Sequence, residues 1–211
     1  MKTRKGEKEK LKTVILDRAI AYLKKHGRGE AGTDQIMKYA GLSRGALYSH
    51  FKSKDDLFAQ AVCHDLARLE ANLAMRFEVE GSVALKGMIE DHLSERSLTD
   101  VGSSCAFTSL STDMQRCKAG HRALYEQHMI RIYGMFAAAL KDQFPDDPPE
   151  ENLAKAINLY SALVGTLTMA RTISDPALAR KTLEGGKRYL LATFVPRSLE
   201  KTVTHDASGH P

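Results

Sequence analysis

Residues 33–57 read TDQIMKYAGLSRGALYSHFKSKDDL, and they are the most informative stretch of the chain. Ile36 and Ala40 lie four residues apart, which is the spacing of apolar residues along one face of a helix. Leu47 and Phe51 repeat this spacing a few residues later. The stretch therefore predicts two short helices in succession, with a third helix beginning directly after the second.

The residues between and on these helices predict a helix-turn-helix. Gly41 can adopt the positive φ that a tight turn needs, and Ser43 can cap the second helix through its hydroxyl. The face of the second helix opposite its apolar side carries small or hydrogen-bonding residues, namely Arg44, Gly45, Ser49 and His50. A helix of this composition suits insertion into a DNA major groove.

The stretch resembles the DNA-binding domain of the TetR family of bacterial transcriptional regulators. The matching positions are Gly41-Leu42-Ser43, Gly45-Ala46-Leu47-Tyr48, His50-Phe51, Lys54 and Leu57. The resemblance covers about residues 8 to 60, and the rest is similar to the family only in length and in being helical. Two positions depart from the family pattern: Met37 stands where a small alanine is usual, and Arg28 where an aromatic residue is common.

The whole chain reads as all-α. The helices expected from apolar spacing and from glycine and proline breaks span about residues 8–26, 34–40, 44–51, 54–77, 83–98, 104–116, 121–143, 150–172 and 176–194. We predict an N-terminal three-helix helix-turn-helix domain over residues 1–53. A C-terminal helical ligand-binding and dimerisation domain is predicted over 54–196, and a disordered tail over 197–211.

The resemblance implies which side chains meet DNA. Phosphate contacts are expected from Thr33, Tyr48, His50 and Lys54. Base-edge contacts are expected from Arg44, Gly45, Ala46 and Ser49, with Arg44 as the candidate for bidentate guanine recognition. Residues 1–28 hold ten lysines and arginines against three acids, in a chain whose net charge is +5. This charge favours a phosphate-facing surface, and the alternative is a solvated terminal segment.

The last two helices carry apolar stripes. The stripes contain Leu159, Ala162, Leu163, Thr166, Leu167 and Ala170, and then Leu183, Leu190, Leu191 and Phe194. The family resemblance implies a homodimer through these helices, whose two-fold symmetry fits a pseudo-palindromic operator of double-stranded DNA. The alternative is that both stripes face the core of their own domain.

The resemblance also implies a small-molecule effector held among the helices after the DNA-binding domain. The candidate contacts are Cys105, Thr108, Tyr125, His128, Met129 and Tyr160, each of which could instead be an ordinary core or surface residue. Cys105 follows Ser103-Ser104, so we expect it in the first turn of a helix, where the helix dipole favours a reactive thiolate. Some family members sense electrophiles or oxidants through a cysteine at this point, and the alternative is a small buried thiol.

The remaining sequence excludes several classes of protein. It has no run of 18 apolar residues and no apolar signal-peptide core, so we expect a cytoplasmic protein without a membrane span. The three cysteines show neither a disulfide framework nor CxxC metal spacing. Ser49-His50-Phe51-Lys52 formally matches SxxK, a motif of serine-nucleophile enzymes. It lies inside the second helix of the helix-turn-helix, however, and the SDN and KTG motifs do not accompany it. We therefore predict no catalytic residue, no metal and no cofactor.

Taken together, these features predict a homodimeric TetR-like repressor released by a small molecule or a reactive electrophile. A TetR-like activator, or a DNA-binding protein without an effector, is one alternative. A small all-helical enzyme or an effector-binding module that does not bind DNA is another.

Overall fold

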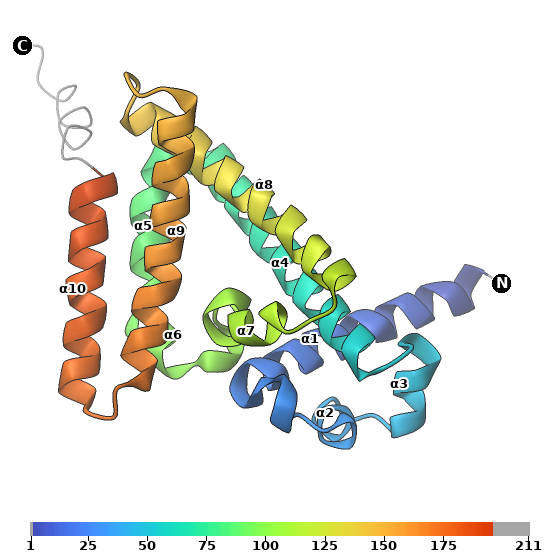
Figure 1. The fold of residues 1–211 in the computed structure, drawn as a ribbon. Helices are drawn as coiled ribbons and strands as arrows, with labels where there is room; N and C mark the ends of the chain where they lie inside the picture. The colour runs from blue at the N-terminus through green and yellow to red at the C-terminus, as the bar shows by residue number, and fades with distance from the viewer. Residues whose placement is uncertain (1, 196–211) are drawn as a thin grey trace, which may run out of the picture. The chain divides into compact units, whose positions relative to one another are not determined.

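The computed structural model describes residues 2–195, without the side chains of residues 2–5 and 44, and all regular elements in this part are helices (Figure 1). The all-α fold predicted from the sequence is thereby confirmed. The α-helices are α1 (Lys2–Glu30), α2 (Thr33–Tyr39), α3 (Arg44–His50), α4 (Lys54–Glu80), α5 (Ala84–His92), α6 (Glu95–Thr99), α7 (Ala106–Gln115), α8 (Ala119–Gln143), α9 (Pro149–Thr172) and α10 (Pro176–Phe194). Two short 3-10 helices are η1 (Gly81–Val83) and η2 (Val101–Ser103). The tail predicted over 197–211 lies outside the described residues.

The helices form two compact units. Among the described residues, 2–75 and 95–132 make the first unit, and 76–94 and 133–195 make the second. The long helices α4 and α8 contribute residues to both units. The boundaries predicted at residues 53 and 196 divide the chain by role rather than by packing, and they stay a prediction.

In the first unit, α1 packs against α2, α7 and η2. Its apolar face is fully buried at Ile15, Ala19 and Leu23, which recur at helical spacing. The helix starts at Lys2, earlier than the predicted residue 8, and its regular part ends at Gly27, whose φ is 70°. Only glycine adopts this conformation at little cost, and the sequence placed the stop at the same residue.

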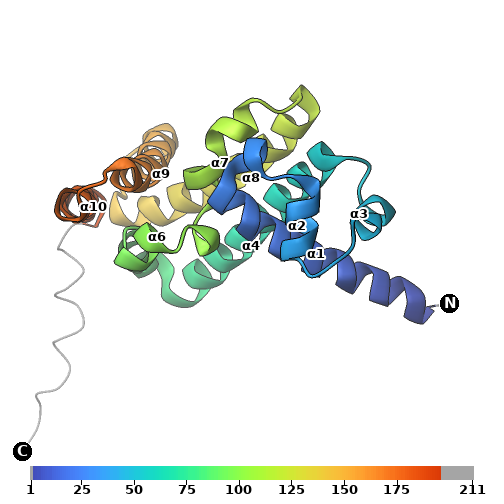
Figure 2. The same ribbon diagram turned by 90° about the horizontal axis from the view of Figure 1, so that it is seen from below.

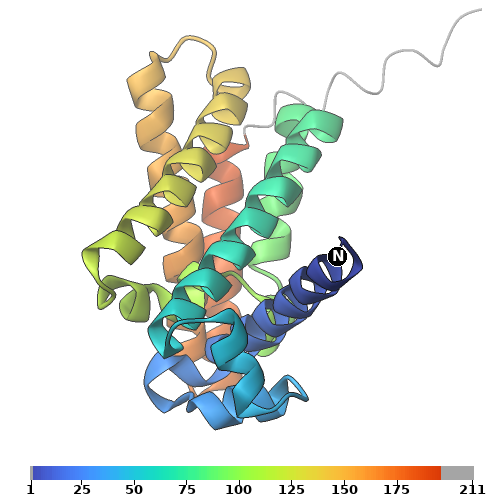
Figure 3. The ribbon, with the colours of Figure 1, turned by 90° about the vertical axis from the view of Figure 1, so that its right-hand side faces the viewer.

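In the second unit, α9 and α10 lie side by side in two views (Figures 1 and 3), and α10 also packs against α5. Gly186 on α10 approaches the side chain of Thr166 so closely that a Cβ there would lie 2.4 Å from it. Most residues of the two apolar stripes are buried within the one chain, including Leu159, Leu163 and Leu190. For these buried residues the predicted position between two protomers is wrong and the alternative of a core role holds, whereas Ala162, Thr166 and Leu191 are only half-buried.

The helix predicted over residues 83–98 is interrupted. It consists of α5 and α6, separated at Leu93 and Ser94. Leu93 has φ −100° and ψ 43°, and its side chain is fully buried. The Ser94 hydroxyl donates to the carbonyl of Asp91, at 2.8 Å, and so competes for an acceptor that a continuing helix would use. Local serine chemistry thus ends α5 where apolar periodicity alone predicts continuation.

By length and composition, α9 is the one helix among the described residues that could cross a membrane. Three of its leucines, Leu159, Leu163 and Leu167, are buried within the second unit. An Asn152 side chain is buried on the same helix. These features are those of a core helix, and they do not indicate a membrane span.

A buried histidine makes the second unit sensitive to acid. Burial, and then the positive charge of Arg171, lower the pKa of His92 to about 4. Its Nε2 atom is buried without a hydrogen-bond partner in the described part of the chain. The folded state favours the neutral ring, whereas the unfolded chain takes up a proton near pH 6.5. The contribution of His92 to the free energy of unfolding is therefore complete above pH 6.5 and is lost as the pH falls towards 4.

We expect the free energy of unfolding to fall by about 2 kcal/mol more between pH 7 and pH 5 in the wild type than in His92→Leu, from 1.36 kcal/mol per pKa unit. Urea unfolding at the two pH values measures this difference. Equal pH dependence in both proteins would show that His92 does not titrate in this way.

Candidate nucleic-acid interface

Helices α2 and α3 form a helix-turn-helix around Gly41, whose φ is 71°. The apolar residues predicted to face inward are buried, with Ile36, Leu47 and Phe51 each at most 2% exposed. Met37, one of the two departures from the family pattern, is also buried. The inward faces of both helices therefore belong to the core of the first unit, as their spacing predicts.

The outward face of α3 is open to solvent. Gly45, Tyr48 and Ser49 are exposed, and a Cβ on Gly45 would meet only the Ser43 hydroxyl, at 3.9 Å. Ala46 is half-buried, and its carbonyl accepts the Ser49 hydroxyl at 2.7 Å. The side chains of Gly45, Ala46 and Ser49 on this face are small, which allows close approach of the helix to a DNA groove.

Ser43 does not cap α3 in the predicted way. It occupies the N-cap position with extended backbone, but its hydroxyl accepts no hydrogen bond from the helix. The backbone carbonyl of Ser43 accepts the Ala46 N–H at 3.0 Å instead. The side-chain hydroxyl of Ser43, which is exposed, therefore stays available on the outer surface.

A serine cap does form at the next helix. The Ser53 hydroxyl accepts the Asp56 N–H at 3.1 Å, and the Asp56 carboxylate accepts the Lys52 N–H at 2.8 Å. This reciprocal arrangement resembles a capping box and holds the turn between α3 and α4. Lys54, in the first turn of α4, and Thr33, the first residue of α2, are both half-buried. Both predicted phosphate contacts thus start a helix, where backbone N–H groups also favour anions.

His50 ends α3 beside the amino-terminal part of α1. Burial, and then the positive charges of Lys8 and Lys12, lower the pKa of His50, while Glu9 opposes them. The Lys12 ammonium lies 5.9 Å from the centre of the Phe51 ring. At neutral pH the imidazole is therefore neutral and can donate one hydrogen bond, without adding a charge.

Three sets of ion pairs fasten α1 to α4 behind the helix-turn-helix. The Lys24 ammonium lies 2.7 Å from the Asp65 carboxylate, and the Lys24 side chain is only 3% exposed. Towards the start of α1, Asp17 pairs with His64 and Arg68, each at 2.9 Å. Towards its end, the Arg28 guanidinium pairs with Asp55 at 2.6 Å. These contacts hold α4 against the helix that supports α2 and α3.

A groove of about 570 Å³ lies between α7 and the first half of α8, within the first unit. Its buried part consists of Phe107, Met114 and Tyr125. Its more exposed lining comes from Ser111, Gln115, Ala119, Arg122, Ala123, Glu126 and Met129. A cavity of this size with an apolar floor and a polar rim suits a small, mainly apolar molecule.

Two of the six predicted effector residues, Tyr125 and Met129, line this groove. His128 instead contacts Glu70 on α4, and Thr108 is buried in α7. Tyr160 belongs to the second unit, where its ring packs against Tyr133 and Phe136. Phe107 and Met114 could not be recognised as groove residues from the sequence, because their helical spacing is the same as that of core residues.

Cys105 does not sit in the first turn of α7. It is the N-cap residue, with φ −59° and ψ 135°, and its side chain makes no capping hydrogen bond. Ser103 and Ser104, predicted to cap the helix, donate to Asp100 and Val101 instead. Cys63 lies elsewhere, on α4, where burial raises the pKa of its thiol to about 11 and so disfavours the nucleophilic thiolate.

A chain of hydrogen bonds joins the groove to the end of α1. The Tyr125 hydroxyl donates to the Cys117 sulfur at 3.7 Å, and the Cys117 thiol donates to the Asp113 carbonyl at 3.4 Å. The Asp113 carboxylate accepts the backbone N–H of Arg28 at 2.9 Å.

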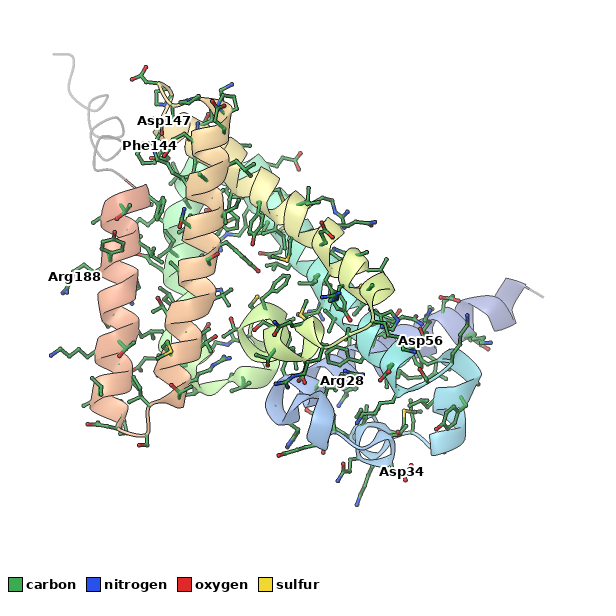
Figure 4. All side chains as sticks on the ribbon, in the orientation of Figure 1. Arg28, Asp34, Asp56, Phe144, Asp147 and Arg188 are labelled. Carbon is green, nitrogen blue, oxygen red and sulfur yellow. The ribbon has the colours of Figure 1, made fainter. Side chains whose placement is uncertain are left out.

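The hydrogen bond from the Arg28 side chain lowers the pKa of Asp55, so the Asp55 carboxylate is charged at neutral pH. The side chain of Arg28, near the end of α1, thus contacts Asp55 at the start of α4 (Figure 4 labels Arg28).

An exposed α3 on a buried helix-turn-helix core defines the class of helix-turn-helix DNA-binding domains. Residues 15–61 match the family described as bacterial regulatory proteins, tetR family. The chain is 39% identical over 56 residues to the HTH-type transcriptional regulator AcrR of Shigella flexneri, which covers 26% of each protein. The match thus spans about a quarter of that relative's length. Residues 15–61 therefore match the DNA-binding domain of the TetR family.

The fold of the rest of the chain is shared with solved structures. A TetR-family transcriptional regulator from Agrobacterium tumefaciens has a TM-score of 0.74 at 16% identity, covering 89% of this chain and 98% of that one. The reduced form of NemR from E. coli has a TM-score of 0.72 at 16% identity, covering 86% of this chain and 95% of that one. At this identity the likeness shows the fold alone.

Proposed function

We propose that this protein is a homodimeric transcriptional repressor that binds a pseudo-palindromic operator through α3 and is released by a small molecule. The exposed, small-residue face of α3 on a buried helix-turn-helix core is the observation that carries the proposal. A regulator of chromosomal genes would work in the cytoplasm. Anisotropy titration of the protein with the DNA upstream of its own gene tests the proposal, and salt-insensitive or absent binding would favour an enzyme or a module without DNA binding.

Arg44→Ala and Lys54→Ala are expected to weaken operator binding in different ways. Loss of a bidentate guanine contact by Arg44 costs roughly 1–3 kcal/mol and relaxes preference at one base pair. Loss of a phosphate contact by Lys54 weakens all sequences alike and lowers the salt slope by about 0.9 per protomer. Titration against a set of single-base operator variants at several salt concentrations separates the two effects. Unchanged preference in Arg44→Ala would refute its base-reading role.

The surface proposed for dimerisation is the face of α9 and α10 that the chain leaves open. Met169, Leu178 and Tyr189 are exposed apolar side chains there, each at least 50% exposed. Gly165 precedes Met169 by one turn, and Gly185 precedes Tyr189 by one turn. A Cβ on either glycine would meet no atom within 4 Å. Small residues beside exposed apolar ones allow two helices of a partner to approach closely.

The groove between α7 and α8 is the proposed effector site. Its floor residues Met114 and Tyr125 adjoin the hydrogen bonds that run through Asp113 to Arg28. A ligand that binds one arrangement of α7 better than another would shift the end of α1 and, through Asp55, the start of α4. The start of α4 follows α3 directly in the chain, so a shift there also moves α3. This route explains how occupation of the groove could alter the position of α3.

Release from the operator by a panel of apolar compounds and electrophiles tests the effector site. We expect apolar compounds to release the wild type but to lose potency against Ala123→Trp, which fills the groove with an indole ring. Cys105→Ser serves as a second test protein, because electrophile release in both proteins alike would exclude Cys105 as a sensor. Release by no compound would favour an effector-free regulator, and stimulated transcription would favour an activator.

A further inference from the structure

The amino-terminal part of α1 extends beyond the domain that α1 supports. Among the described side chains of α1, buried ones begin only at Ile15, and those from Gly6 to Lys10 are all exposed. Figure 2 shows this end of the helix running past α3 rather than ending beside α2. About three turns of helix therefore project from the first unit without a core of their own to cover.

One face of this projection is lysine-rich and continues the apolar face of α1. Lys8 and Lys12 lie one turn apart and stand at helical spacing from Ile15. Lys12 lies over the Phe51 ring. Burial is the larger cause of the lowered pKa of His50, and the charges of both lysines, which are close to it, lower this pKa further. Lys10 lies on the opposite side of the helix, by its spacing. Two lysines thus continue the surface at the carboxyl end of α3.

The charge of this segment favours a polyanion. Residues 2–12 carry six lysines and arginines against two glutamates, a net charge of +4, out of +5 for the whole chain. Glu9 is the acid that opposes the lysines near His50. Lysines on a rigid helix, such as the exposed Lys8 and the half-buried Lys12, are held apart at fixed spacing. They therefore meet successive phosphates at a lower entropy cost than a flexible tail would.

We propose that the Lys8–Lys12 face of α1 contacts the phosphates of DNA that flanks the sequence read by α3. The proposal rests on the DNA-binding function proposed above. The face adjoins His50, itself an expected phosphate contact, so the same duplex that enters at α3 continues along α1. Such contacts carry no base information, and they add affinity and orientation.

Salt-dependent binding of Lys8→Gln/Lys12→Gln tests this surface. The probe is a duplex selected from random sequence by the wild-type protein, used with flanks and trimmed to the selected core. We expect the slope of log K against log salt to fall in magnitude by about 1.8 per protomer on the flanked duplex, from about 0.9 for each of two phosphates. Base preference stays unchanged, and the loss disappears on the trimmed duplex.

Lys10→Gln/Lys141→Gln is the matched control, because it removes the same charge from exposed positions outside the proposed face. It should bind with the wild-type slope. A wild-type slope in Lys8→Gln/Lys12→Gln, while Lys54→Ala lowers it, would overturn the flanking contact and leave the proposed function intact. An equal loss in both double variants would also overturn it, since net charge would then be responsible. Absence of any DNA binding by the wild type would remove both proposals.

Discussion

Asp65→Ala is expected to lower the free energy of unfolding by about 3–5 kcal/mol, which is the cost of leaving a buried charge without its partner. The stranded charge is the ammonium of Lys24, whose side chain is 3% exposed and which lies 2.7 Å from Asp65. This pair joins α1 to α4 behind the helix-turn-helix. Urea unfolding, followed by circular dichroism at pH 7, measures the loss.

Replacement of the other partner of this ion pair, Lys24, provides the control. Lys24→Met strands an Asp65 carboxylate that is 17% exposed and can keep some contact with water, so it should cost less. The double variant Lys24→Met/Asp65→Ala leaves no unpaired charge and should be more stable than Asp65→Ala alone. If the double variant lost the sum of the two single losses, the pair would not be coupled and the assigned cause would be wrong.

Tyr189→Glu is expected to produce monomers and to weaken operator binding by about 100-fold or more, because two linked half-site contacts become independent. Tyr189 is 68% exposed on α10 and makes no core of its own chain. A carboxylate there would be buried against the partner without a counter-charge, whereas it would stay hydrated in the monomer. Sedimentation velocity at micromolar concentration measures the assembly, and anisotropy measures the binding.

Two further variants separate assembly from folding. Leu153→Glu places a carboxylate on an exposed residue of α9 outside the proposed surface, and it should remain dimeric. Leu163→Glu places one in the core of the second unit, and it should unfold this unit instead of releasing folded monomers. A dimeric Tyr189→Glu, or a monomeric wild type, would refute the proposed surface.

Much of the DNA-binding domain follows from the sequence alone. The spacing of Ile36, Leu47 and Phe51 determines which face of each helix turns inward, because apolar burial has the period of the helix. Gly27 and Gly41 mark the ends of α1 and α2 because only glycine tolerates their φ values. Both the apolar spacing and the glycine conformations are local properties, so they can be predicted without knowledge of any distant contact.

The tertiary structure alone decided which apolar faces meet. The stripes on α9 and α10 have the same period whether they cover a core or a second protomer, and their packing within one chain settles Leu163 and Leu190 as core residues. For the same reason the groove could not be predicted. The apolar spacing of Phe107 and Met114 on α7 is that of core residues, and only the packing of α8 beside α7 makes them part of a groove. A sequence therefore determines which side of each helix avoids water, and only the packing of distant segments determines what covers that side.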